Sequence, residues 1–364
     1  MVRFNRLEIS YFRNLSSVAI DLAPGLNTFY GDNGAGKTAL LEAVHLLCRG
    51  RSFRTQKTQT LIQHGVDQLV VRAVIGDEAR GRTTLAISKD RRARTEMRLN
   101  GEVERRLSEV ARLTPLQVML PDIADLVFGA PSKRRSWLDW GTFHVKPTYL
   151  ETLRKYLRAV KQRNVLLKEQ ADAKSLAPWH EEVARLGEIV TSDREAYLTQ
   201  LLPHFKKILA ELAPGLELEM GYQRGWGKGE TLSKLLADSS ARELKYASTL
   251  WGPHRADVLI RSDEAPAGSV LSRGQGKLVA SALQIGQASL LAESEQRSTV
   301  FLIDDAGAEL DVAHNARFFA LLERLGGQIL ATTTRGPEKQ GAQLRSAPNT
   351  GVFHVEHGAV APGG

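Results

Sequence analysis

The chain has 364 residues, 42% hydrophobic and 25% charged, which is typical of a globular protein and excludes a disordered or fibrous one. Its formal net charge of +8 points to a polyanionic partner. The single cysteine excludes a disulfide framework and a cysteine-based zinc site, and no apolar stretch is long enough to span a membrane. We therefore expect a cytoplasmic protein with about two domains.

The first third of the chain predicts strands around a glycine-rich loop. The strands are expected at 4–9, 18–22, 26–30, 69–75, 82–88, 94–99 and 116–120, and an apolar-periodic helix at 39–47. The alternating runs between residues 69 and 104 predict an antiparallel meander, with a tight turn at Asn100-Gly101.

The middle of the chain predicts a mainly helical block, and the last quarter returns to an α/β pattern. Long helices are expected at 149–170 and 179–212. The later elements are expected as strands at 258–260, 299–303, 328–333 and 351–357, with helices at 274–292 and 313–325.

The strongest motif follows the pattern G-x-x-x-x-G-K-[ST] between a predicted strand and a predicted helix, as a phosphate-binding loop requires. Glycines let backbone N–H groups turn towards phosphates, and the helix N-terminus adds positive potential. A lysine at the motif's end reaches the β- and γ-phosphates, and the next hydroxyl reaches Mg²⁺. The ATP-binding residues are expected to be Gly31, Asp32, Asn33, Gly34, Ala35, Gly36, Lys37 and Thr38.

A second motif consists of two carboxylates at the end of the buried strand 299–303. A P-loop enzyme needs such a pair beside its metal, with Asp304 holding Mg²⁺ and Asp305 orienting a water. Because Thr38 and Asp304 must meet at one Mg²⁺, the two ends of the chain must form one lobe. Lys37, Asp304 and Asp305 are therefore the predicted catalytic residues.

A third motif stands just before the helix expected at 274–292. Ser272 and the N–H groups of that helix can form a second anion site, although a simple helix cap is the alternative interpretation. Two phosphate sites suit a pair of facing protomers, each lending Ser272 to the γ-phosphate of the other. The predicted contributors in trans are Ser272, Arg273, Gly274 and Gln275.

These motifs resemble those of ABC-type ATPases: 272–275 is similar to their signature motif, and 308–311 resembles their dimer-contact loop. Within that group the chain resembles the RecF family of SMC-like recombination mediators. The segments that carry this resemblance follow one another along most of the chain: 11–15, 31–38, 51–54, 134–135, 138–140, 161–164, 251–255 and 271–275.

The resemblance implies an ATP-dependent homodimer on DNA with a weak, DNA-stimulated ATPase. It also implies action at single-strand gaps with RecR and RecO, helping RecA to load. By resemblance, Arg13 and Asn14 belong to the adenine side of the pocket, and Gln117 is a metal ligand. Asp305 replaces the glutamate of most ABC ATPases, and threonines at 332–334 replace a switch histidine, which fits slow hydrolysis.

The basic charge gathers in two segments. Residues 80–106 contain nine Lys/Arg against four Asp/Glu, and a second cluster begins the helical block. Both can contact phosphates without reading sequence, although a solvated, salt-bridged face is the alternative. The predicted DNA-binding residues are Arg91, Arg92, Arg94, Arg98, Lys133, Arg134 and Arg135.

The expected fold is α/β: an ABC/SMC-type P-loop ATPase head with an antiparallel β subdomain and an inserted helical lobe. Residues 1–115 and 276–364 should form the ATPase lobe, and 116–275 the helical lobe ending at the signature motif. The alternative functions are a transport ATPase subunit, for which the threonines at 332–334 are unsuited, and a compact SMC-like DNA-bridging ATPase.

Overall fold

The computed structural model describes residues 2–77, 81–227, 229–306, 312–334, 336 and 349–363. The chain divides into two compact units. Lobe I comprises Met1–Ile123 and Leu291–Gly364, and lobe II comprises Ala124–Leu290. These limits correct the boundaries expected after residues 115 and 275. Strand β8 (Leu116–Met119) pairs within the lobe I sheet, and helix α10 (Arg273–Glu295) stays with lobe II through residue 290.

One sheet of lobe I is antiparallel, in the order β2-β1-β4-β5-β6-β7. Buried residues occur at every second position in part of β2, at Val18 and Ile20, and in part of β5, at Leu85 and Ile87, as one packed and one more accessible face require. Asn100 and Gly101 both have positive φ, at 52° and 87°, which confirms the predicted tight turn between two strands of the meander. The strands are β1 (Arg3–Phe12), β2 (Leu15–Asp21), β4 (Gln68–Asp77), β5 (Gly81–Asp90), β6 (Thr95–Leu99) and β7 (Glu102–Val103).

The other sheet of lobe I is parallel except for one edge strand, in the order β15-β14-β3-β13-β12-β8. Every residue of β12 and β13 is buried, which explains their unbroken apolar or small-residue sequences. Besides β8, its strands are β3 (Leu26–Tyr30), β12 (Val300–Ile303), β13 (Ile329–Thr333), β14 (Gly351–Glu356) and β15 (Ala359–Pro362).

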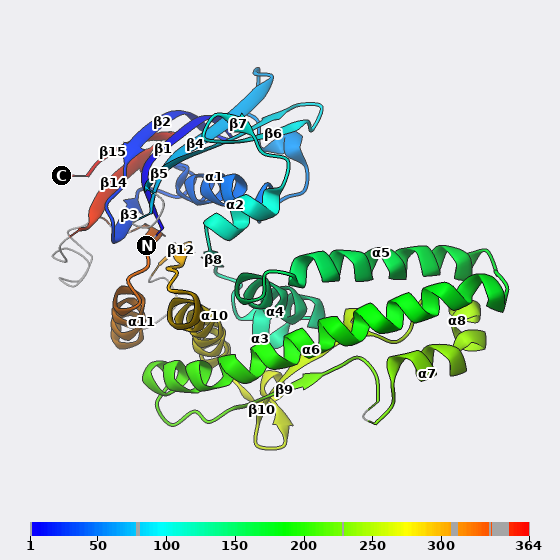
Figure 1. Ribbon diagram of the computed structural model, residues 1–364. Coiled ribbons are helices and arrows are strands. Elements are labelled where there is room, and N and C mark those ends of the chain that lie inside the picture. Colours follow the sequence, from blue (N-terminus) through cyan, green and yellow to red (C-terminus); the bar gives the residue numbers. More distant parts are fainter. Residues whose placement is uncertain are drawn as a thin grey trace. The chain divides into compact units, whose positions relative to one another are not determined.

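Helix α1 (Lys37–Arg49) packs against strands of both sheets, including β1, β4, β5 and β13, and is buried on almost all sides (Figure 1). Its Cys48 is fully buried, and burial raises the pKa of that thiol to about 11, so the cysteine is inert. Lobe I also contains helices α2 (Leu107–Leu113), α11 (Val312–Arg324) and the short 3₁₀ helix η1 (Thr58–Thr60).

Lobe II is mainly helical, and its helices α5 (Tyr149–Lys168) and α6 (Ala173–Leu212) pack side by side (Figure 1). The longer one starts at Ala173, before the expected residue 179, because Asp172 caps it by accepting from Ser175 N at 2.8 Å. The helices are α3 (Asp125–Phe128), α4 (Pro131–Val145), α5 (Tyr149–Lys168), α6 (Ala173–Leu212), α7 (Leu232–Asp238), α8 (Ser240–Tyr246), α9 (Ala267–Val270) and η2 (Pro253–Arg255). A small sheet contains β9 (Glu219–Gln223), β10 (Asp257–Ser262) and β11 (Ala265–Pro266).

Three of the sequence segments that carried the resemblance make buried polar contacts within lobe II. The fully buried Arg163 contacts Glu243, and it donates to Thr249 Oγ1 at 2.8 Å. Arg194 contacts Asp139 at 2.7 Å and donates to Pro253 O at 2.7 Å. The segments 138–140, 161–164 and 251–255 therefore hold the helices and the η2 turn of lobe II together.

Because of the surroundings of His254, we expect the free energy of unfolding of lobe II to fall as the pH falls. Its Nδ1 lies 2.6 Å from Tyr156 Oη and its Nε2 lies 3.1 Å from Thr249 O, which fits a neutral ring donating from Nε2. Burial, reinforced by nearby arginines, lowers the pKa of His254 to about 4. Between about pH 6.5 and 4 the unfolded chain therefore binds a proton that the folded chain does not, so stability falls as pH falls, by up to about 1.4 kcal/mol per pH unit.

Urea unfolding at pH 7.5 and 5.5 measures this loss. Glutamine can make both of the same hydrogen bonds without titrating, so His254→Gln should show a smaller loss between the two pH values than the wild type. An equal loss in both proteins would contradict the role of His254.

Candidate nucleotide-binding site

The loop between β3 and α1 has the geometry of a phosphate-binding loop. Gly36 takes φ 119°, a conformation that residues with a side chain rarely adopt, and a Cβ there would lie 2.9 Å from Leu15 Cδ2. Gly358 N donates to Ala35 O at 2.9 Å and Asn14 Nδ2 donates to Gly34 O at 3.2 Å, which fixes the loop from outside. The first N–H groups of α1 consequently face the space that the loop encloses.

Lys37 lies at the start of α1 with its side chain folded back onto the loop. Its Nζ donates to Gly31 O at 2.7 Å and to Asp32 O at 2.9 Å. Burial lowers the pKa of Lys37, while the carboxylates of Asp305, Asp304 and Asp32 oppose that shift. The ammonium group is thus held at the mouth of the loop. An anionic ligand bound there would replace the two carbonyl oxygens as the hydrogen-bond acceptor of Lys37.

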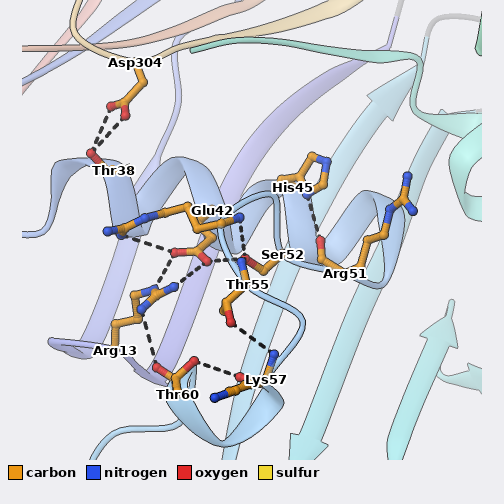
Figure 2. A network of polar contacts seen from close by, with 11 residues as sticks. Arg13, Thr38, Glu42, His45, Arg51, Ser52, Thr55, Lys57, Thr60 and Asp304 are labelled. Atoms are coloured by element: carbon orange, nitrogen blue, oxygen red, sulfur yellow. Dashed lines mark hydrogen bonds and ion pairs between the residues drawn. The ribbon is translucent and has the colours of Figure 1, made fainter. Parts of the chain in front are cut away.

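Thr38 and Asp304, which are 266 positions apart, are in contact (Figure 2). Thr38 Oγ1 lies 3.0 Å from Asp304 Oδ1 and 3.1 Å from Oδ2. The contact arises because β3 and β12 are parallel and flank β13, so the loops after them share one edge of the sheet. A hydroxyl and a carboxylate brought together in this way are oxygen ligands that suit Mg²⁺.

Asp305 and Thr332 complete this edge. Asp305 is exposed, with φ 58°, and its N–H donates to Thr332 Oγ1 at 2.8 Å. Thr332 Oγ1 in turn donates to Asp304 Oδ1 at 2.7 Å. The sequence analysis considered Thr332 only as part of a threonine run that replaces a switch histidine. It did not predict the contact of Thr332 with Asp304.

Arg13 and Asn14, expected on the adenine side, have different surroundings. Asn14 reaches the P-loop, as described above. Arg13 forms a bidentate ion pair with Glu42, a fully buried residue of α1, with one N–O distance of 2.7 Å (Figure 2). The Arg13 guanidinium is therefore committed to Glu42 in this structure.

Glu42 also anchors the segment that follows α1. It accepts a hydrogen bond from Ser52 Oγ (Figure 2). It also lies 3.7 Å from an Arg54 nitrogen. This segment borders a pocket of about 550 Å³ that carries cations but no carboxylate in its lining. The cationic lining residues are Arg51, Arg54 and Lys89. Sequence reasoning singled out 51–54 only by resemblance and missed Glu42, because an acidic residue inside an apolar helix gives no sign of its partner.

Gln117 does not lie at the sheet edge. Gln117 is 6% exposed within β8 and pairs with Phe301 of β12. Phe301 stands three residues before Asp304 in the sequence. At about 3.3 Å per residue this places it roughly 10 Å along the strand from the carboxylate. Its expected role as a metal ligand is corrected accordingly, because the register of β8 against β12 sets it back from the edge.

The signature segment begins α10 in lobe II. Ser272 Oγ accepts from Gln275 N at 3.2 Å, and Gln275 Oε1 accepts from Ser272 N at 2.9 Å, which is a capping box. All residues from Ser272 to Gln275 are exposed. The expected dimer-contact loop at 308–311 lies outside the described residues.

The basic residues of the meander lie on exposed positions. Glu96 and Arg98 flank the buried Met97 on β6 as alternation requires, and Arg98 Nε contacts Glu96 at 2.7 Å. Arg94, just before β6, is also exposed. Arg91 donates to the carbonyls of Val66 and Gln63 at 2.7 and 3.1 Å. These side chains remain accessible at the surface of lobe I.

The second basic cluster is different. Arg134 forms a bidentate ion pair with Asp257 at 2.7 and 2.9 Å, and it donates to Gly129 O at 2.8 Å. Arg135 donates to Ala256 O at 2.7 Å, and burial lowers the pKa of Arg135. The expectation that these two arginines face DNA is corrected, because their charges are used to join α4 to β10. Lys133 stays exposed and contacts Asp125 at 2.6 Å.

A P-loop beside an aspartate-ended strand, in a lobe assembled from both ends of the chain, defines an SMC-like ATPase head of the ABC class. A family model described as the RecF/RecN/SMC N terminal domain matches residues 3–360. DNA replication and repair proteins RecF from Shewanella baltica and Shewanella loihica are each 36% identical to the chain, over 98% of both lengths. The chain belongs to the RecF family.

Solved structures agree with this assignment. A structure of the recombination mediator protein RecF with ATP, from the RecFOR pathway, superposes with a TM-score of 0.87 at 26% identity, over 99% of this chain and 97% of that one. The Smc head domain of Pyrococcus furiosus shares the fold, with a TM-score of 0.61 at 16% identity over 99% of this chain and 95% of that one. Among the described residues, the helices are all too short or too polar to cross a membrane.

Proposed function

We propose that the chain is an ATP-dependent recombination mediator that binds DNA at single-strand gaps. The observation that carries this proposal is the contact of Thr38 with Asp304 beside a complete P-loop, in a member of the RecF family. ATP is supported as the nucleotide by the related RecF structure that contains it.

Each residue of the site has a proposed role. Lys37 binds the β- and γ-phosphates, while Thr38 and Asp304 hold Mg²⁺, which when bound neutralises phosphate charge. Asp305 orients the attacking water. Aspartate is one methylene shorter than glutamate, which fits a weak ATPase that acts as a switch.

ATP is proposed to pair two protomers. The exposed capping box of Ser272 in one copy contacts the γ-phosphate bound to the other copy. Arg273, Gly274 and Gln275 thus also contribute to the nucleotide site of the partner copy. Hydrolysis separates the pair. RecR and RecO are the proposed partners in helping RecA to load, because the related structure is that of a mediator in the RecFOR pathway.

DNA is proposed to lie against the meander of lobe I. Exposed arginines and the cationic pocket that includes Lys89 provide phosphate contacts without reading base sequence. The meander residues in this surface are Arg91, Arg92, Arg94 and Arg98, and Lys133 of lobe II remains a further candidate.

The test is DNA binding to gapped, duplex and single-stranded substrates of equal length, each with ATP, ADP or no nucleotide. ATP should tighten binding to the gapped DNA about tenfold, which is the usual size of coupling between two sites. Equal affinity under all three nucleotide conditions would contradict ATP gating.

The same assay locates the surface. Arg92→Ala with Arg94→Ala should weaken binding to all substrates and reduce its salt dependence. Arg185→Ala, on an exposed pair with Glu182 in α6, is the matched control and should bind as the wild type does.

A further inference from the structure

One residue of the parallel sheet is hydrogen-bonded to both aspartates of the site, to the side chain of Asp304 and to the backbone of Asp305. Thr332 is 1% exposed on β13, between β3, which leads into the P-loop before Thr38, and β12, which ends just before Asp304. Its hydroxyl donates to Asp304 Oδ1 at 2.7 Å and accepts from Asp305 N at 2.8 Å. Its carbonyl also accepts from Ala306 N at 2.7 Å. Asp304, Asp305 and Ala306, which follow β12, are thereby each hydrogen-bonded to Thr332.

This attachment matters because the turn is strained. Asp305 has φ 58°, in the left-handed region that costs a non-glycine residue about 1 kcal/mol or more. Such a conformation persists only where neighbouring groups hold it. The hydrogen bond from Asp305 N to the Thr332 hydroxyl is a specific contact that does so.

We propose that Thr332 is a positioning residue for metal binding: its hydroxyl orients the Asp304 carboxylate towards Thr38 and fixes the backbone of Asp305. The inference rests on the proposed function. Hydrogen-bond partners of a metal ligand fix its orientation, and losing one weakens metal binding about 10- to 100-fold. Valine has the shape of threonine without its hydroxyl, so Thr332→Val removes both side-chain contacts and leaves Asp304 Oδ1 with one donor fewer.

The experiment measures how Mg²⁺ changes the affinity of the full chain for a fluorescent ATP analogue. In the wild type, Mg²⁺ should tighten nucleotide binding. In Thr332→Val, the Mg²⁺ concentration required should rise at least about tenfold. Affinity without Mg²⁺ should stay as in the wild type, because Lys37 and the P-loop are untouched. Electron paramagnetic resonance of Mn²⁺ added with the nucleotide gives a second measure of metal binding.

Two variants serve as controls. Thr332→Ser keeps the hydroxyl and should bind Mg²⁺ as the wild type does; if it behaves like valine, the hydroxyl is not the cause and the proposal fails. Thr299→Val makes the same replacement at a residue 3% exposed, next to β12, whose hydroxyl has no hydrogen-bond partner among the described residues. It should leave Mg²⁺ dependence unchanged.

The outcomes separate this proposal from the function on which it rests. If the wild type binds nucleotide with Mg²⁺ dependence and Thr332→Val shows the same dependence, only the role of Thr332 is overturned. If the wild type binds no ATP, or binds it equally with and without Mg²⁺, the proposed function and this inference are both overturned.

Discussion

Lys37→Ala should abolish the effect of ATP on DNA binding while leaving binding without nucleotide unchanged. The ammonium group is the cation held within the P-loop, where it donates to two carbonyl oxygens and can exchange them for phosphate oxygens. Hydrogen bonds from a charged group contribute about 1.5–3 kcal/mol each, so losing both should weaken ATP binding at least roughly 100-fold. Titration with a fluorescent ATP analogue measures this loss.

The control for that variant is Lys174→Ala, at an exposed position near the start of α6. It removes the same charge and should change neither ATP affinity nor the ATP effect on DNA. If Lys37→Ala kept the ATP effect, the P-loop assignment would be wrong, whatever the outcome for the DNA surface.

The P-loop and Asp304 could be predicted from sequence because each depends on local features. The glycine spacing fixes the backbone of the loop, and a buried strand that ends in an acid places that acid at the sheet edge. The meeting of Thr38 and Asp304, 266 positions apart, then follows from the chemistry of a shared Mg²⁺, without knowledge of the intervening chain.

The errors arose where a role depends on a partner distant in sequence. Arg134 belongs to a basic run that resembles a DNA surface, but its partner Asp257 is 123 positions away and charge patterning cannot reveal it. Gln117 was assigned without the register of β8 against β12, which sets it back from the edge. Thr332 is one of three threonines, and only the register of β13 against β12 distinguishes it.

Glu42 contacts two sequence segments whose structural role could not be derived from the sequence. It is fully buried, yet it binds Arg13 from the β1–β2 turn and Ser52 from the segment after α1. Glu42 follows Thr38 by one helical turn on α1. The nucleotide site, the turn and the cationic pocket consequently share one rigid helix.

Arg13→Ala should destabilise lobe I by about 3 kcal/mol, because it leaves the buried Glu42 carboxylate without its main cation. Arg54, at 3.7 Å, and Ser52 compensate only in part. If Arg13 instead served the adenine alone, its loss would lower ATP affinity and leave stability unchanged. Urea unfolding without nucleotide separates the two roles.

A double-mutant cycle makes the test specific. Glu42→Gln removes the buried charge, so Arg13→Ala should cost less stability in that background than in the wild type, and the difference is the coupling between the two side chains. Arg6→Ala is the matched control, since Arg6 pairs with Glu8 and Asp21 at an exposed site where an ion pair contributes at most about 1 kcal/mol. A coupling near zero between Arg13 and Glu42 would show that the ion pair does not hold the turn to α1.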